Sequence, residues 1–434
     1  MVFDTFMFKD KTIIVNPKNA SWVVTDSEAR NLILSKKLKD MPLDARKAVK
    51  KSGIFSEDEF FDAKHDLILG ILAVTKGCNL QCKYCYADAG IEKGSMHLSA
   101  AKKCIDFLTD SKFKRVTILF HGGEPSLMGK DWFKEILLYI ELKRKKHKKK
   151  KINVRMQTNA TLIDEEFAKL LANFGVKVGI SIDGPPKIND RTRPFVNGSG
   201  ASKSVLCGLS NLQKSRIHPG SIMVVSRLNF DKMKDCLKFF TSKGIDSVKI
   251  IGVSCLGRSA KNKEYQITPM QYYRAIKDAT DFCLKSEKKI TLTPVSYLIY
   301  NLISKDRSYM CLRSPCGAAN SALAFDCEGN VYPCDDLIGK QQYVLGNVFK
   351  NDIAEVLGSK MAREFRKRTV SKIEGCKKCT WRNFCGGGCA GRVLLTYNTL
   401  NHSSDICAYY KNMFPYLIRL LYEDKEKVFE KLIK

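Results

Sequence analysis

The stretch LILGILAVTKGCNLQCKYC, residues 67–85, joins an apolar run to three cysteines, Cys78, Cys82 and Cys85, spaced CX3CX2C. The apolar run is typical of a buried strand, and the cysteines follow it in a short loop. A [4Fe–4S] cube has four iron corners, normally held by four thiolates. Three thiolates in one loop therefore leave one iron open to a small molecule that binds through amino and carboxylate groups. A structural zinc ion requires four closed ligands, usually from CX2C pairs, and fits this spacing poorly.

Beyond this stretch, short apolar runs alternate with helix-length segments. Six runs are expected to form strands, at residues 67–74, 116–120, 154–157, 176–182, 222–225 and 248–253. Strand–helix alternation favours a parallel sheet. Six units are too few for a closed eight-stranded barrel, so we predict an α/β fold with an open, partial (β/α)6 barrel related to the TIM barrel. In such a fold the chemistry lies at the carboxyl ends of the strands.

The residue before the third cysteine is aromatic, Tyr84, and the resulting CX3CXΦC pattern resembles the signature of radical-SAM enzymes. Further motifs that resemble those of the family follow the next three strands in order: GGEP at 122–125, QTN at 157–159 and SIDGP at 181–185. The resemblance implies that Cys78, Cys82 and Cys85 hold a cluster that binds S-adenosyl-L-methionine (SAM) and cleaves it to a 5′-deoxyadenosyl radical. It also implies SAM contacts from Tyr84, Gly122, Gly123, Glu124, Pro125, Asn159, Ser181, Asp183 and Arg193.

Within this set, the resemblance gives each motif a role. The GGEP loop is expected to hold the SAM amino group. Ser181 and Asp183 are expected near the SAM carboxylate and ribose, and Arg193 is a candidate partner of the carboxylate.

The chain has 17 cysteines, and eight of the candidate ligands lie after residue 305. Disulfides are rare in the cytoplasm, so metal binding or catalysis is the better interpretation of so many cysteines. The spacings CX12GX4C and CX2CX5CX3C resemble the SPASM domain, which binds two auxiliary [4Fe–4S] clusters in peptide-modifying radical-SAM enzymes. The resemblance implies one cluster on Cys311, Cys316, Cys334 and Cys389 and another on Cys376, Cys379, Cys385 and Cys407.

Asp335 directly follows the candidate ligand Cys334. A carboxylate beside a cluster can take a proton from a substrate that is being oxidised. Asp335 matches the position of the base in anaerobic sulfatase-maturing enzymes, and the alternative is an ordinary loop aspartate that bonds to the backbone. The neighbouring Asp336 is expected to be dispensable.

The auxiliary clusters imply a net oxidation of the substrate. We expect a maturase that forms thioether or carbon–carbon crosslinks in a ribosomally made precursor peptide. The alternative is an anaerobic sulfatase-maturing enzyme that oxidises cysteine or serine of a protein substrate to formylglycine.

Residues 1–65 are expected to form a small α+β module, followed by the barrel at 66–304, the SPASM domain at 305–412 and a C-terminal helix at 413–434. The module is similar to the winged-helix element with which peptide maturases recognise a leader, and this similarity is the reason for preferring crosslinking. Residues 11–15 are the expected edge strand to which a leader adds.

The net charge of +29 attracts anions such as acidic peptides, nucleic acid or a membrane surface. Its densest run, KRKKHKKKK at 143–151, has no interleaved aromatics and is typical of a solvated helix end. Nucleic acid is therefore not an expected partner, and a non-enzymatic zinc or nucleic-acid-binding protein is only a further alternative. No apolar run approaches the ~20 residues of a membrane span, and no secretory signal is recognised. We expect a cytoplasmic enzyme that receives electrons from a protein such as flavodoxin or ferredoxin.

Overall fold

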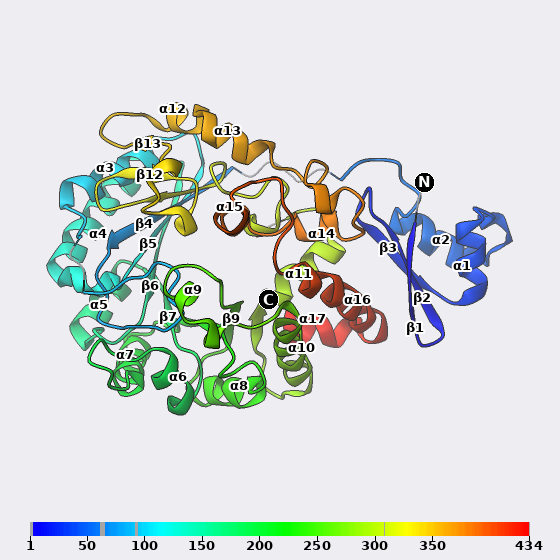
Figure 1. Cartoon of the computed structure of the whole chain (residues 1–434), viewed down its shortest axis with the longest axis horizontal. Coiled ribbons are helices and arrows are strands. Elements are labelled where there is room, and N and C mark those ends of the chain that lie inside the picture. The colour runs from blue at the N-terminus through cyan, green and yellow to red at the C-terminus, as the bar shows by residue number, and fades with distance from the viewer. Residues whose placement is uncertain (1–2, 61–65, 92–93, 308, 434) are drawn as a thin grey trace.

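The computed structural model describes residues 3–60, 66–91, 94–307 and 309–433. Figure 1 places the N-terminal residues (blue) at one end of the molecule and the large sheet with its helices (cyan to green) at the other. Much of the cysteine-rich C-terminal segment (orange to red) lies between them.

One large sheet positions the site. Its parallel strands are β4 (Leu67–Thr75), β5 (Arg115–Gly122), β6 (Lys151–Thr158), β7 (Lys177–Ser181), β8 (Gly220–Val225), β9 (Ser247–Gly252), β10 (Thr291–Thr293) and β11 (Ala322–Phe325). Two short antiparallel strands, β12 (Asn330–Tyr332) and β13 (Gly346–Asn347), complete it in the order β10-β9-β8-β7-β6-β5-β4-β11-β12-β13. The six predicted strands are confirmed as β4 to β9, in a mostly parallel sheet consistent with a partial barrel. β10 and β11 were not predicted.

Helices cover the outer face of the sheet, since that face carries the apolar residues of each strand. They are α3 (Leu98–Thr109), α4 (Gly129–Lys146), α5 (Glu165–Asn173), α6 (Pro186–Thr192), α7 (Ser202–Lys214), α8 (Met233–Ser242), α10 (Pro269–Lys285) and α11 (Val295–Ile303). The short helix α9 (Arg258–Lys261) follows β9 and does not belong to this layer. In β6, for example, Ile152, Val154 and Met156 are buried in the main core with Phe133 and Phe167 of the helices. Because side chains alternate along a strand, the residues between them face the inside of the partial barrel.

Within the described residues, the C-terminal segment is built from five short helices and one long helix, α16, with glycine-rich turns between the cysteines. These are α12 (Ile353–Gly358), α13 (Lys360–Lys367), α14 (Arg382–Cys385), α15 (Ala390–Tyr397), α16 (Cys407–Glu423) and α17 (Lys425–Leu432). The prediction of one terminal helix at 413–434 was wrong in its start and in its number of helices. The first helix begins at Cys407, and Asp424 separates it from the second, because the Asp424 side chain accepts a bond from the Lys427 N–H and caps a new helix.

The N-terminal module is a three-stranded antiparallel sheet, β1 (Asp4–Phe8), β2 (Lys11–Asn16) and β3 (Ser21–Thr25), followed by α1 (Ser27–Leu34) and α2 (Leu43–Ser52). A winged helix is not confirmed. β2 is the central strand, so the prediction that residues 11–15 form an edge was wrong. β1 and β2 form a hairpin, whose turn uses Lys9 with a positive φ of 50°.

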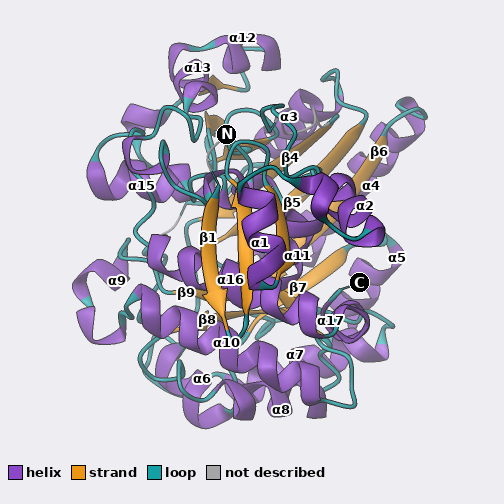
Figure 2. Ribbon diagram, turned by 90° about the vertical axis from the view of Figure 1, so that its right-hand side faces the viewer, coloured by secondary structure: helices purple, strands orange, loops and turns teal. Residues whose placement is uncertain are grey.

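Both faces of the N-terminal sheet are covered. Ile14 packs with α1 and α2, whereas its neighbours Ile13 and Val15 belong to the main core. Figure 2 shows α1 in front of this sheet. On the other side, Phe6 lies against Trp381, with ring centroids 5.2 Å apart, and Thr380 donates a 2.6 Å hydrogen bond to Asp4. The module is therefore docked on the loop that precedes α14.

In the part of the chain that the structure describes, no helix combines the length and the apolar character needed to cross a membrane.

Candidate active site

The segment that follows β5 fixes the start of the loop with Cys78, Cys82 and Cys85. The Gly123 N–H donates to the Thr75 carbonyl and the Glu124 N–H to the Gly77 carbonyl, both at 2.8 Å. A Cβ on Gly123 would lie 2.0 Å from the Gly77 carbonyl oxygen, so this close approach requires glycine. Gly122 ends β5 with a φ of 124°, and Pro125 opens a buried 3-10 turn.

The Glu124 carboxylate is buried and joins the loops after β5 and β6. It accepts bonds from the Ser126 hydroxyl and the Thr158 hydroxyl, each at 2.6 Å, and from the Asn159 N–H at 2.6 Å. Burial raises the pKa of Glu124, although these bonds act in the opposite direction. Asn159 in turn donates to Asn79 at 2.9 Å, and the Ser181 hydroxyl accepts from Gln157 at 3.0 Å.

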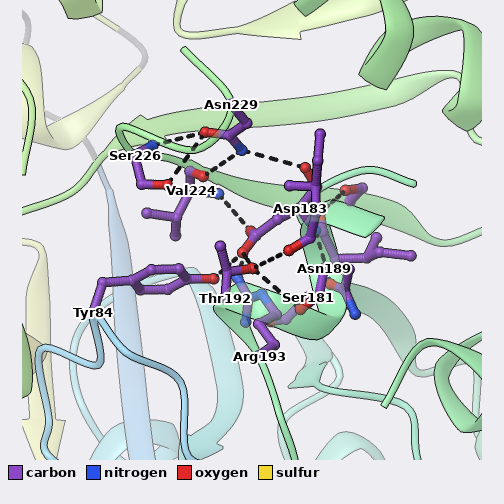
Figure 3. A network of polar contacts seen from close by, with 12 residues as sticks. Tyr84, Ser181, Asp183, Asn189, Thr192, Arg193, Val224, Ser226 and Asn229 are labelled. Carbon is purple, nitrogen blue, oxygen red and sulfur yellow. Dashed lines mark hydrogen bonds and ion pairs between the residues drawn. The ribbon is translucent and has the colours of Figure 1, made fainter. Parts of the chain in front are cut away.

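Asp183 is the centre of a polar network at the end of β7 (Figure 3). Its Oδ1 accepts from Arg193 Nη2 at 3.1 Å and from the Val224 N–H at 2.9 Å. Its Oδ2 accepts from the Thr192 hydroxyl at 2.7 Å and closely from the Tyr84 hydroxyl. Asp183 is completely buried. Both carboxylate oxygens are thus occupied by the protein, and the geometry suits a residue that positions Arg193 and Tyr84 better than one that contacts a ribose directly.

Arg193 is buried with an unsatisfied group. Its Nε has no hydrogen-bond partner among the described residues, although its guanidinium is paired with Asp183 and lies 5.3 Å from the centre of the Tyr84 ring. A buried N–H without a partner costs free energy unless a ligand supplies an acceptor. The guanidinium therefore fits the carboxylate that an amino-acid cofactor such as SAM presents.

The three cysteines of the first loop are half-buried, and all 17 cysteines are free of disulfides. Burial raises the pKa of Cys78 to about 12 and that of Cys82 to about 11, and the charge of Cys85 adds to both shifts. Thiolates in this loop therefore need a compensating positive charge, which iron supplies.

This burial gives the iron-free protein a pH-dependent stability. Unfolding exposes thiols with a pKa of about 8.5, whereas the folded pKa values are higher, so the stabilisation is complete below that pH and is lost as pH rises through the folded values. We expect the free energy of unfolding of the apoprotein, measured by urea denaturation, to fall between pH 8 and 11 by up to about 1.4 kcal/mol per pH unit for each thiol with a raised pKa. The iron-loaded protein, whose thiolates are bound to metal, is the control. Equal falls for both forms would contradict this reasoning.

The eight C-terminal cysteines separate into two neighbourhoods. In the first, burial is the main cause that raises the pKa of each thiol, and neighbouring thiolate charges raise it further. Cys316 acts in this way on Cys311, Cys316 and Cys389 act on Cys334, and Cys311 acts on Cys389. In the second, thiolate charges likewise link Cys376, Cys379, Cys385 and Cys407. Charge interactions of this kind require close approach, so the four members of each predicted set lie near one another.

These sets differ from a site for one ion. Among residues 3–60, 66–91, 94–307 and 309–433, no three His, Cys, Asp or Glu side chains converge as ligands of a single metal ion do. A four-iron cube holds its cysteines at separate corners, so its ligands stand further apart than those of one zinc ion. The donor type and the grouping fit clusters.

Asp335 lies between the first cysteine loop and the C-terminal cysteines. The Tyr86 hydroxyl, next to Cys85 in the chain, donates to Asp335 Oδ2 at 3.3 Å. Asp336 faces the other way, where it accepts a 3.4 Å bond from the Cys389 thiol and lies 3.8 Å from Arg392. Burial raises the pKa of Asp336, which Arg392 opposes. The sequence did not single out Tyr86 or Arg392, and it suggested that Asp336 is dispensable; only the position of Tyr86 beside Cys85 could have indicated that residue.

Arg258, in α9 after β9, clamps the first cysteine loop. Its Nη1 donates to the Cys82 carbonyl at 2.8 Å, its Nη2 to the Ala89 carbonyl at 2.5 Å, and its Nε lies 3.2 Å from Asp88. A Cβ on the preceding Gly257 would lie 2.3 Å from the Tyr86 carbonyl oxygen, so glycine lets this strap approach. Nothing in the sequence pattern indicated the clamp, because its partners lie about 170 residues away.

Replacing Arg258 with glutamine removes these contacts, and we expect the first cysteine loop to lose its iron more easily. Each lost hydrogen bond is worth about 1 kcal/mol, so iron release to a chelator under anaerobic conditions should be about tenfold or more faster for four of the iron atoms. Arg274→Gln, at an exposed arginine of α10, is the matched control. Release at the wild-type rate in Arg258→Gln would show that the clamp does not hold the loop.

Two family models match the chain. The radical SAM superfamily model covers residues 72–240, and the SPASM iron–sulfur cluster-binding domain model covers residues 316–380.

Several curated proteins are similar over most of their length. The cysteine-type anaerobic sulfatase-maturating enzyme of Clostridium perfringens is 28% identical over 364 residues, which are 81% of this chain and 96% of the relative. A serine-type enzyme of Bacteroides thetaiotaomicron is 24% identical, over 72% of this chain and 80% of the relative. An uncharacterized protein of Archaeoglobus fulgidus is 29% identical, with 84% of each chain covered.

Solved structures show the same architecture. Native anSMEcpe with bound AdoMet and the Cp18Cys peptide has a TM-score of 0.72 and 26% identity, covering 82% of this chain and all of that one. SuiB of Streptococcus suis, bound to its precursor peptide SuiA, has a TM-score of 0.60 at 16% identity and covers 93% of this chain, which is a likeness of fold.

Proposed function

The chain belongs to the radical-SAM enzymes that carry a SPASM iron–sulfur domain, and from this we propose that it oxidises a cysteine or serine side chain of a polypeptide to the aldehyde formylglycine. The enzyme uses three [4Fe–4S] clusters and SAM, of which one cluster binds SAM and two are auxiliary. When bound, these groups supply the one-electron cleavage of SAM that removes a hydrogen atom from the substrate, and an acceptor for a further electron.

We assign the ligands of these groups from the cysteine neighbourhoods. Cys78, Cys82 and Cys85 hold the SAM-binding cluster. Two groups of four C-terminal cysteines hold the auxiliary clusters: Cys311, Cys316, Cys334 and Cys389, and Cys376, Cys379, Cys385 and Cys407. Arg193 binds the SAM carboxylate, Asp183 holds Arg193 in place, and the GGEP loop provides the wall on which the SAM amino group rests.

One observation carries the choice of reaction: the carboxylate of Asp335 lies between the two cysteine regions, fixed by the Tyr86 hydroxyl at 3.3 Å. For a cysteine substrate, Cβ loses a hydrogen atom, the thiol loses a proton and the side chain loses one electron, which gives a thioaldehyde. Water then converts the thioaldehyde to the aldehyde and releases hydrogen sulfide. Asp335 is placed to take the proton from the substrate thiol, or from the hydroxyl of a serine substrate.

The comparisons support this reaction better than the crosslinking that the N-terminal module suggested. The cysteine-type and serine-type relatives are sulfatase-maturating enzymes, and anSMEcpe binds a cysteine peptide. Crosslinking stays as the second candidate for two reasons. The N-terminal module contacts the C-terminal cysteine loop through Trp381. The similarity to the SuiB fold also covers a larger share of this chain than the similarity to anSMEcpe does. In either case we propose a polypeptide substrate, a reducing flavodoxin or ferredoxin as electron donor, and a cytoplasmic location.

The test is the product of anaerobic incubation with SAM, dithionite and a pool of peptides that includes Cp18Cys and its serine counterpart. We expect an aldehyde that a hydrazide probe captures, together with 5′-deoxyadenosine. A peptide that loses two hydrogen atoms but yields no aldehyde would indicate crosslinking instead. Formation of 5′-deoxyadenosine with every peptide in the pool unchanged would contradict both candidates for this substrate class.

A further inference from the structure

Lys249 lies on the inner face of the partial barrel, close to the level of the SAM site. Its neighbours in β9, Val248 and Ile250, are buried in the main core, so the Lys249 side chain points to the opposite face. The sheet register pairs Ser181 with Ile222 and Ile222 with Lys249. Lys249 therefore lies on the same hydrogen-bonded row as Ser181, a residue proposed to lie near SAM.

The surroundings of Lys249 connect it to the proposed base and to the first auxiliary cysteine group. Its Nζ lies 5.7 Å from the centre of the Tyr309 ring, and Tyr309 stacks on Tyr297 with centroids 4.5 Å apart and planes 6° apart. Burial raises the pKa of the Cys311 thiol, and the positive charge of Lys249 opposes this shift. Burial lowers the pKa of His121, the charge of Asp335 opposes this shift, and the charge of Lys249 adds to it. The Lys249 ammonium is thus close enough to the space between the proposed SAM site and Asp335 to interact electrostatically with a substrate bound there.

A second cation faces the same interior. Arg155 of β6 alternates with the core residues Val154 and Met156, and it is exposed although it lies within a central strand. Burial raises the pKa of Tyr297, the partner of Tyr309 in the stacked pair, and the charge of Arg155 opposes this shift. The two tyrosines therefore lie between the two cations.

Neither cation has a hydrogen bond or an ion pair with any part of the chain that the structure describes. Two carboxylates lie within range of the Lys249 charge, and both have other partners: Asp335 accepts from Tyr86, and Asp336 is paired with Cys389 and Arg392. Because neither cation is paired with a carboxylate of the chain, both are available to a counter-ion that the substrate brings. With a net charge of +29, the chain as a whole also favours an acidic substrate.

We propose that Lys249, assisted by Arg155, forms a subsite for a carboxylate of the substrate polypeptide, so that this enzyme selects a cysteine or serine with an acidic residue nearby. The inference rests on the proposed function, since it takes a polypeptide as the bound substrate. It adds the chemical class of the flanking residue, which the identity of the oxidised side chain does not specify.

The test is a charge exchange in the loaded enzyme, with binding and product formation measured separately. Three matched series of peptides carry a central cysteine and one glutamate, glutamine or lysine. Within each series, this residue is placed in turn at each of the four positions on either side of the cysteine. Binding is followed by fluorescence anisotropy, and product by the hydrazide probe. We expect the wild type to bind the best glutamate peptide about tenfold more tightly than its glutamine counterpart. Lys249→Met, which keeps the contact with Tyr309, should remove that preference, and Lys249→Glu should favour lysine.

Lys145→Met, in the exposed lysine run of α4, is the control that should leave the preference unchanged. The subsite is refuted if Lys249→Met weakens the binding of the glutamate and glutamine peptides equally. It is also refuted if the variant changes only the midpoint potential of an auxiliary cluster, because Lys249 then compensates the charge of that cluster. A wild type without any glutamate preference refutes it too. A retained preference without aldehyde formation would leave the subsite intact and refute the proposed reaction instead.

Discussion

Replacing Cys78, Cys82 and Cys85 together with alanine is expected to abolish 5′-deoxyadenosine formation while leaving roughly eight iron atoms bound, the content of two four-iron clusters. The reason is spatial: these three thiols lie in one loop after β4, fixed by the GGEP segment and by Arg258, whereas the other eight candidate ligands form two separate neighbourhoods. Removing the loop thiols should therefore leave the C-terminal sites folded and loaded.

Iron and sulfide analysis, with chromatography of the SAM products, measures both parts of this expectation. Replacement of the buried Cys104 and Cys283 with alanine is the matched control, since these two cysteines belong to the core and to no ligand group. That variant should keep SAM cleavage and its full iron content. SAM cleavage by the loop variant, or loss of all its iron, would contradict the proposed division of the cysteines.

Asp335→Asn is expected to reduce aldehyde formation by about a hundredfold or more, the usual range for loss of a positioned base, while 5′-deoxyadenosine is still made. Asparagine keeps the size of the side chain and an acceptor for the Tyr86 hydroxyl, so the loop should not move. The substrate should then lose its hydrogen atom but transfer its proton slowly. Simultaneous measurement of 5′-deoxyadenosine and aldehyde separates these steps.

The control for this variant cannot be Asp336→Asn, although the sequence alone suggested that Asp336 is dispensable. Asp336 is half-buried and contacts the Cys389 thiol and Arg392, so its replacement should disturb a proposed cluster ligand. Glu364→Gln, on the exposed surface of α13, is a better control because it lies outside the site. If Asp335→Asn forms aldehyde at the wild-type rate with all clusters present, Asp335 is an ordinary loop residue.

Local sequence patterns predicted the sheet well because each central strand carries a continuous or alternating apolar run. They missed β10, whose three residues are too short to show a period, and they placed an edge strand at residues 11–15, which form the central strand β2 of the N-terminal sheet. They also missed β11, which joins the sheet beside β4 although it is about 250 residues further along the chain.

The cysteine ligands and the SAM motifs could be read from spacing, because each lies within a short loop. The contacts that orient them could not. Arg258 reaches the first cysteine loop from a different strand, and Asp335 meets Tyr86 only when the C-terminal segment returns to the barrel. Asp183 illustrates the same limit, since its motif suggested a cofactor contact whereas the fold surrounds both of its oxygens with protein donors.

The most direct measurement of the proposed reaction uses a Cp18Cys peptide in which deuterium replaces both hydrogens on the cysteine Cβ, incubated anaerobically with the loaded enzyme, SAM and dithionite. Transfer of one deuterium into 5′-deoxyadenosine, with formation of a hydrazide-reactive aldehyde on the peptide, is the expected result. Modified peptide accompanied by 5′-deoxyadenosine without deuterium would show that hydrogen is removed elsewhere, and would contradict oxidation at the cysteine side chain.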